Sequence, residues 1–78
     1  MNKIFELTRE VIAECVDARE TSLGVSITLD SGMALTIVQE AHPWGIVKGL
    51  DYCTVEIDGK CFNIAALVLE NSIRLTHS

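Results

Sequence analysis

Residues 52–65 carry the strongest local fold signal in the chain, and they read YCTVEIDGKCFNIA. Apolar and polar residues alternate on both sides of Asp58-Gly59, a dipeptide that favours the left-handed backbone of a two-residue hairpin turn. If these two residues form the turn, Ile57 lies opposite Lys60, and every second residue of each strand shares a face. The stretch therefore predicts an antiparallel β-hairpin with a defined register.

Three further segments alternate with the same period of two. Two of them flank Asp30-Ser31-Gly32, whose composition is typical of a turn, so we expect a second hairpin there. The last segment follows a turn at Glu70-Asn71. Taken together, the expected strands are residues 24–30, 33–40, 51–57, 60–66 and 72–76.

The start of the chain has a different period. Between residues 2 and 20 the apolar residues are spaced three or four apart, which is typical of one face of an amphipathic helix. These residues are Ile4, Phe5, Leu7, Val11, Ile12, Cys15 and Val16. The sequence therefore predicts a helix over residues 2–20. Four carboxylates, which form either a solvated face or a docking stripe, lie on its other side: Glu6, Glu10, Glu14 and Asp17.

One helix followed by five short strands predicts an α+β fold. Short strands avoid exposed edges by curling into a barrel, so we expect a five-stranded antiparallel SH3-like or Sm-like β-barrel, capped by the N-terminal amphipathic helix. A chain of 78 residues has room for one small domain, residues 1–78. It buries only about 60–65% of its unfolded surface, which favours a homo-oligomer formed through the helix face or through Ile37-Val38.

The charge balance disfavours binding to nucleic acids and to anionic membranes. Eleven acidic residues against six basic ones give a net charge of −5, so the molecule as a whole repels nucleic-acid phosphate and anionic membranes. Glu6, Arg9 and Glu10 interrupt the place where the apolar core of a signal peptide would lie. No window approaches the roughly 18 apolar residues of a membrane span. We therefore expect a cytoplasmic protein that does not contact a membrane.

The residues that carry chemistry are sparse. Cys15, Cys53 and Cys61 form no C-x-x-C pair and have no histidine at metal-ligand spacing, and the hairpin register separates the last two across the sheet. We expect no disulfide, metal or cofactor. His42 and a cysteine would make a base and a nucleophile, but no third orienting group or oxyanion element accompanies them. The sequence thus indicates a protein that is not an enzyme.

The segment of residues 41–49 contains one proline and two glycines, and a binding function is expected in such a loop. Trp44, the only tryptophan, is either an exposed binding anchor or a cover over an open end of the core. A small-ligand pocket around His42 and Trp44 is one alternative function. Whether the His42-Pro43 bond is cis stays open.

The order of one helix and five strands is similar to that of Sm, Lsm and Hfq proteins, and residues 25–32, VSITLDSG, resemble the opening strand and glycine-ended turn of that family. The resemblance implies a ring that binds RNA, in which Lys48 and Lys60 of several subunits converge on a pore. The sequence departs from the family at Ile37, where a glycine is expected, and in the loop at residues 42–45. The Arg-Gly or Lys-His pair that grips RNA is absent from its last hairpin.

The chain is also similar to the Rof family of inhibitors of Rho-dependent termination, in its order of elements and in residues 50–59, LDYCTVEIDG. Rof proteins are acidic and cover a basic RNA-binding surface on a protein partner, a mechanism that suits a net charge of −5. We expect a binding module that contacts a basic protein surface, as an inhibitor or adaptor of a nucleic-acid-binding protein. The expected contact residues are Glu6, Glu10, Glu14, Asp17 and Trp44. The RNA-binding ring and the small-ligand barrel are the alternatives.

Overall fold

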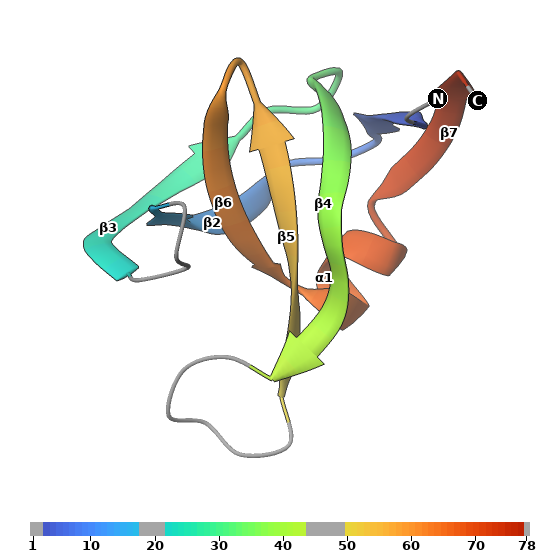
Figure 1. Ribbon diagram of the computed structural model, residues 1–78. Coiled ribbons are helices and arrows are strands. Elements are labelled where there is room, and N and C mark those ends of the chain that lie inside the picture. Colours follow the sequence, from blue (N-terminus) through green and yellow to red (C-terminus); the bar gives the residue numbers. More distant parts are fainter. Residues whose placement is uncertain (1–2, 18–21, 44–49, 78) are drawn as a thin grey trace.

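The computed structural model shows a mostly antiparallel sheet of seven strands with one short helix (Figure 1). It describes residues 3–17, 22–43 and 50–77. The strands are β1 (Ile4–Leu7), β2 (Val11–Val16), β3 (Ser22–Leu29), β4 (Ala34–Pro43), β5 (Asp51–Ile57), β6 (Lys60–Ala65) and β7 (Ile73–His77), and helix α1 is Ala66–Glu70.

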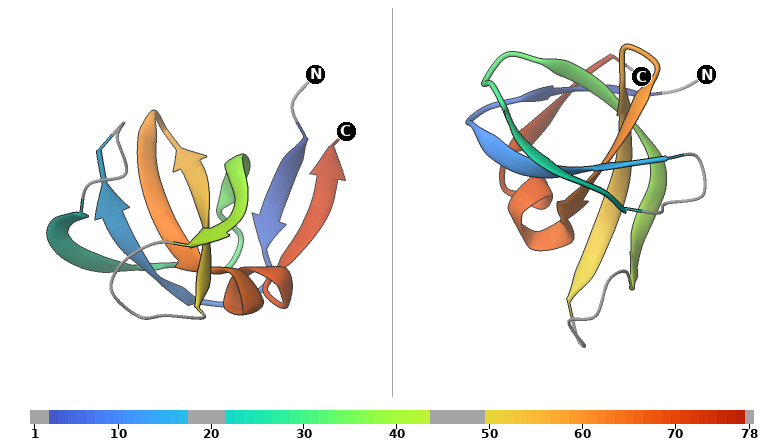
Figure 2. Two further views of the ribbon diagram at one scale, coloured as in Figure 1. Left: turned by 60° about the horizontal axis from the view of Figure 1, so that its bottom comes forward. Right: turned by 90° about the vertical axis from the view of Figure 1, so that its left-hand side faces the viewer.

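The order of the strands across the sheet is β3-β2-β6-β5-β4-β1-β7. β3 and β7 end this order and are not paired with each other, so the sheet is not closed. Figure 2 shows β3 and the paired strands β1 and β7 at opposite ends of the curled sheet. The prediction of a five-stranded closed barrel is therefore wrong, because two additional strands lie in the N-terminal segment and the ends of the sheet do not meet.

The N-terminal amphipathic helix predicted over residues 2–20 is also wrong. The described part of this range forms β1 and β2, and its burial follows a period of two. Val11 and Ala13 are buried, whereas Ile12 between them is 72% exposed. A short apolar run fits either period, and β-branched residues such as Val11 and Ile12 pack well in strands. Pairing of β2 with β3 and β6 makes this segment a strand and not a helix.

The hairpin predicted from residues 52–65 is confirmed together with its register. Ile57 lies opposite Lys60, and Glu56 lies opposite Cys61. Asp58 has a φ of 51° and Gly59 a φ of 77°, so both turn residues adopt the left-handed backbone. A two-residue turn of this kind matches the right-handed twist of the strands that it joins.

The other predicted hairpin is wrong in its pairing, although both of its halves are strands. β3 pairs with β2, and β4 pairs with β5 and β1. The turn between them bonds instead to the end of β1: the Gly32 amide donates to the Leu7 carbonyl at 2.8 Å, and the Leu7 amide donates to the Met33 carbonyl at 2.9 Å. Turn residues thus mark where a strand ends without deciding its neighbour.

The hydrophobic core lies on one face of the sheet. Alternate residues of the central strands point into it, and Leu69 of α1 adds the one buried side chain of the helix. The buried cluster consists of Leu7, Val11, Ala13, Leu29, Leu35, Cys53, Val55, Ile57, Phe62, Ile64 and Leu69. Side chains at the intervening positions of β2, β5 and β6 therefore belong to the opposite face.

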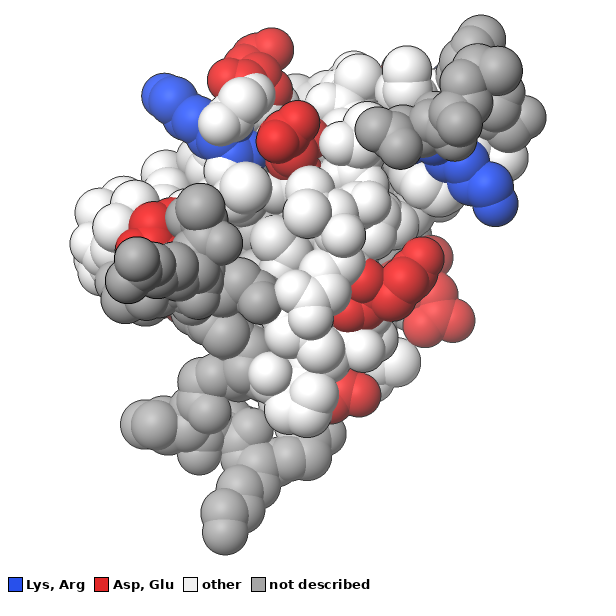
Figure 3. Space-filling model, viewed as in Figure 1, with Lys and Arg blue, Asp and Glu red and all other residues white. Residues whose placement is uncertain are grey.

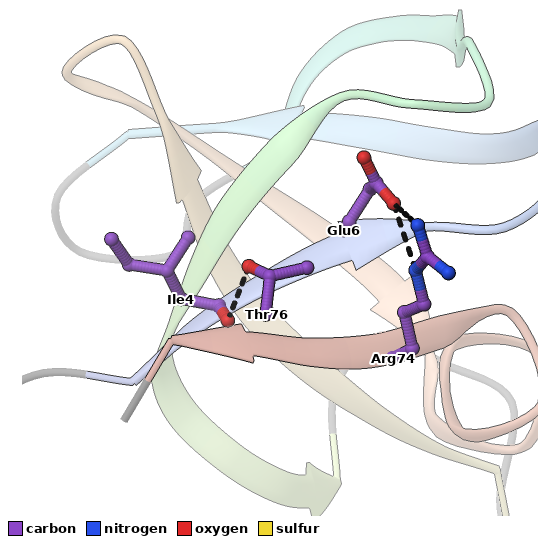
Figure 4. A network of polar contacts seen from close by, with 4 residues as sticks. All are labelled: Ile4, Glu6, Arg74 and Thr76. Carbon is purple, nitrogen blue, oxygen red and sulfur yellow. Dashed lines mark hydrogen bonds and ion pairs between the residues drawn. The ribbon is translucent and has the colours of Figure 1, made fainter.

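β1 and β7 join the two ends of the described chain. Ile4 lies opposite His77, and the Thr76 hydroxyl donates to the Ile4 carbonyl at 3.0 Å. Arg74 donates to one carboxylate oxygen of Glu6 from Nε at 2.9 Å and from Nη2 at 2.6 Å (Figure 4). No helix in the described ranges is long and apolar enough to cross a membrane.

Candidate functional site

A row of polar side chains crosses the face of the sheet opposite the core. Four successive pairs of directly opposed residues connect five neighbouring strands, from β3 through β2, β6 and β5 to β4. Directly opposed residues of paired strands share a face and lie side by side. We call these residues the polar row: Ser26, Glu14, Asn63, Thr54 and Gln39.

The centre of the polar row is buried. Thr54 is 3% exposed and Asn63 is 1% exposed. The Thr54 hydroxyl donates to Asn63 Oδ1 at 2.7 Å. Asn63 Nδ2 is buried and has no hydrogen-bond partner in the described part of the chain. A buried donor without a hydrogen bond lowers the stability of the fold by about 1–3 kcal/mol. The Asn63 amide is therefore a position where a hydrogen-bond acceptor from a ligand would be favourable.

A groove of about 430 Å³ lies over one end of the polar row. Its lining residues are Glu10, Val11, Ile12, Glu14, Ser26, Tyr52, Asn63, Ala65 and Val68. Asn63 is buried and forms its floor, whereas Ile12 and Val68 are exposed and form an apolar rim. The groove thus combines two carboxylates, a phenol, a hydroxyl and an amide donor with apolar surface.

The four predicted carboxylates do not form one stripe, because the segment that carries them is not a helix. Glu10 and Glu14 line the groove together. Glu6 lies on β1 and pairs with Arg74 of β7. Asp17 lines a second groove of about 530 Å³. Figure 3 shows one face of the molecule, on which the acidic residues lie in several separate places. The basic residues on this face are also separated from one another.

The basic residues of the predicted RNA site are not brought together among the described residues. Lys60 lies beside the β5–β6 turn and lines the second groove, whereas Lys48 lies outside the described residues. Trp44 also lies outside them, so its predicted contact is untested. No cis peptide bond occurs in the described residues, which include both His42 and Pro43. His42 Nδ1 lies 2.8 Å from the Glu40 carbonyl oxygen.

The second groove is mainly apolar. It is lined by the end of β2, the first half of β3, the β5–β6 turn and the start of β6, and its residues are Cys15, Val16, Asp17, Leu23, Val25, Gly59, Lys60, Cys61 and Phe62. The cysteines are free thiols. Within the described ranges, no group of three His, Cys, Asp or Glu side chains is placed to hold a metal ion.

Ser26, Tyr52 and Asn63 are site residues that the sequence analysis missed. One of them had a signal: the predicted hairpin register places Asn63 opposite Thr54, which gives two polar residues side by side within otherwise apolar strands. Ser26 and Tyr52 reach the groove through the pairing of β2 with β3 and β6, for which the sequence carries no local signal.

No protein-family model, curated protein or solved structure matches the chain.

Proposed function

We propose that this protein is a non-enzymatic binding module that captures a protein partner by a basic segment, which docks in the groove beside Glu10 and Glu14. One observation supports this proposal above the others: two carboxylates share a groove whose rim is apolar. The net charge of −5 adds long-range attraction for a basic partner and raises the association rate.

The groove suits the two parts of a basic side chain. Lysine and arginine carry a long aliphatic stem below a charged head, and the stem gains free energy when it covers apolar surface. The exposed side chains of Ile12 and Val68 offer such surface next to the carboxylates. Hydrogen bonds between a cationic donor and a carboxylate are about twice as strong as neutral ones.

A partner of this kind is a nucleic-acid-binding protein, whose phosphate-binding surface is rich in lysine and arginine. Occupation of that surface by the acidic module would block nucleic acid, so the module would act as an inhibitor or an adaptor.

The experiment is a quantitative pull-down from extracts of the source cells with three tagged forms of the protein. Glu10→Gln/Glu14→Gln removes two carboxylates from the groove, and Glu56→Gln/Glu70→Gln removes two exposed carboxylates outside it. We expect a basic protein to be captured by the wild type and by the control pair, and to be lost from the groove pair. Equal capture by all three forms, or equal loss from both pairs, would contradict the proposal.

A further inference from the structure

The geometry points to an extended peptide segment as the occupant of the groove, bound by its main chain as well as by its charge. We propose that a main-chain carbonyl of this segment accepts a hydrogen bond from Asn63 Nδ2, while an arginine or lysine side chain of the same segment reaches Glu10 and Glu14. The inference rests on the proposed function and narrows it, because it names what the groove recognises besides positive charge.

Asn63 needs a group that accepts a hydrogen bond. Its Oδ1 atom already accepts from the Thr54 hydroxyl, so the unpaired atom is the Nδ2 donor. Guanidinium and ammonium groups carry donors and no acceptor. A basic side chain alone therefore leaves the amide unsatisfied, whereas a peptide supplies a carbonyl with each residue.

Access to Asn63 decides which group can serve as this acceptor. Asn63 lies at the floor of the groove and its Nδ2 atom is buried, so a ligand reaches the amide only when the neighbouring side chains move aside. The neighbouring lining residues include Ser26 and Ala65, whose side chains are small. A carbonyl oxygen is a single atom that projects from the peptide chain. With the carbonyl at Asn63, the cationic side chain of the peptide extends toward Glu14 on β2 and toward Glu10, which directly precedes β2.

The Thr54–Asn63 pair can be replaced in a way that distinguishes a binding role from a structural one. Replacing both partners of a buried hydrogen bond by apolar residues of similar shape is nearly neutral or stabilising. Thr54 and Asn63 lie opposite each other at the centre of the polar row, and both side chains are buried. Thr54→Val/Asn63→Leu should therefore keep the stability and lose the main-chain contact, which separates a binding role from a structural one.

The experiment measures the affinity of two probes by calorimetry: a glycine-rich pentapeptide with one central arginine, and ethylguanidinium, which has the cation without a carbonyl. For Thr54→Val/Asn63→Leu we expect an unchanged or higher melting temperature, about five- to tenfold weaker binding of the pentapeptide, and unchanged binding of ethylguanidinium. Glu10→Gln/Glu14→Gln should weaken the binding of both probes, and Glu56→Gln/Glu70→Gln should change neither.

The outcomes separate this inference from the function on which it rests. If the Thr54→Val/Asn63→Leu protein binds both probes as the wild type does, or loses both equally, the carbonyl contact is wrong and the charge-based function stands. If the groove carboxylates can be removed without effect on either probe, the proposed function is wrong. Titration of the wild type with the pentapeptide gives a test that needs no variant: the Asn63 side-chain amide protons should shift downfield in NMR spectra, and unshifted resonances would overturn the inference.

Discussion

Cys53 shows how the surroundings of one residue set its chemistry. The side chain is 7% exposed and packs in the core of the sheet. Burial raises the pKa of its thiol, and the negative charges of Glu40, Glu70 and Asp51 raise it further. The thiolate is the reactive form of cysteine, so Cys53 should react more slowly than the half-buried Cys15 and Cys61.

The same pKa shift predicts a pH dependence of stability. In the unfolded chain the Cys53 thiol ionises in its usual range, near pH 8.5, whereas in the folded protein it ionises at higher pH. Its contribution to the free energy of unfolding is therefore complete below that range and falls as the pH rises through it. We expect the urea midpoint to fall between pH 8 and pH 10 by more in the wild type than in Cys53→Val. Equal slopes in the two proteins would contradict the shift.

The β5–β6 hairpin shows what local sequence alone can predict. Its strands and its turn are contiguous, so the alternation and Asp58-Gly59 together predict both the pairing and the register. Its register also gives the Thr54–Asn63 pair at the centre of the candidate site. Glu10 and Glu14 were predicted as partner-binding residues for a different reason, as members of a helix face.

The strands whose pairing partners are distant in the sequence could not be predicted from local sequence patterns. β2 is a strand because it lies between β3 and β6, and the spacing of its apolar residues fits a helix equally well. The turn after β3 was recognised, but β4 pairs with β5 and β1 instead of β3. Pairing between strands that are distant in the sequence therefore determines that the sheet is open. It also determines that Ser26 and Tyr52 line the groove.

The β5–β6 turn depends on the left-handed backbone of its two residues. Gly59 has a φ of 77°, and a Cβ added there would meet no atom within 4 Å, so the cost of a side chain is one of backbone conformation alone. We expect Gly59→Ala to lower the free energy of unfolding by about 1–2 kcal/mol. Asp58→Asn should have little effect, because asparagine tolerates the left-handed backbone. Urea denaturation measures both, and a neutral Gly59→Ala would contradict the turn geometry.

The open sheet leaves β3 as an edge strand. Residues 22–29 contain no charged residue and no proline, the features that usually protect an edge. Leu23 is 58% exposed and Val25 is 51% exposed. The small size of the chain predicts a homo-oligomer, and the exposed edge of β3 is a candidate contact surface for it besides Ile37-Val38. The helix face that was also predicted as a contact surface does not exist, because that segment forms strands.

Native mass spectrometry at micromolar concentration tests which surface is used. We expect Val25→Lys to convert the oligomer to a monomer, because a charge on an edge strand opposes pairing with a second copy. Val38→Lys places the same charge on an exposed residue of β4 and should leave the oligomer intact. Dissociation by Val38→Lys alone would instead favour the contact surface at Ile37-Val38, and a monomeric wild type would exclude both.

The pairing of β1 with β7 has a practical consequence for protein engineering. Because Ile4 and His77 are opposed in adjacent strands, a short linker suffices to connect the two ends of the sheet. A circular permutant could then be opened at the Asp58-Gly59 turn, or the whole unit could be inserted into a surface loop of a reporter protein. In either format the groove beside Glu10 and Glu14 lies away from the junction, so the permuted or inserted unit would keep its recognition surface available.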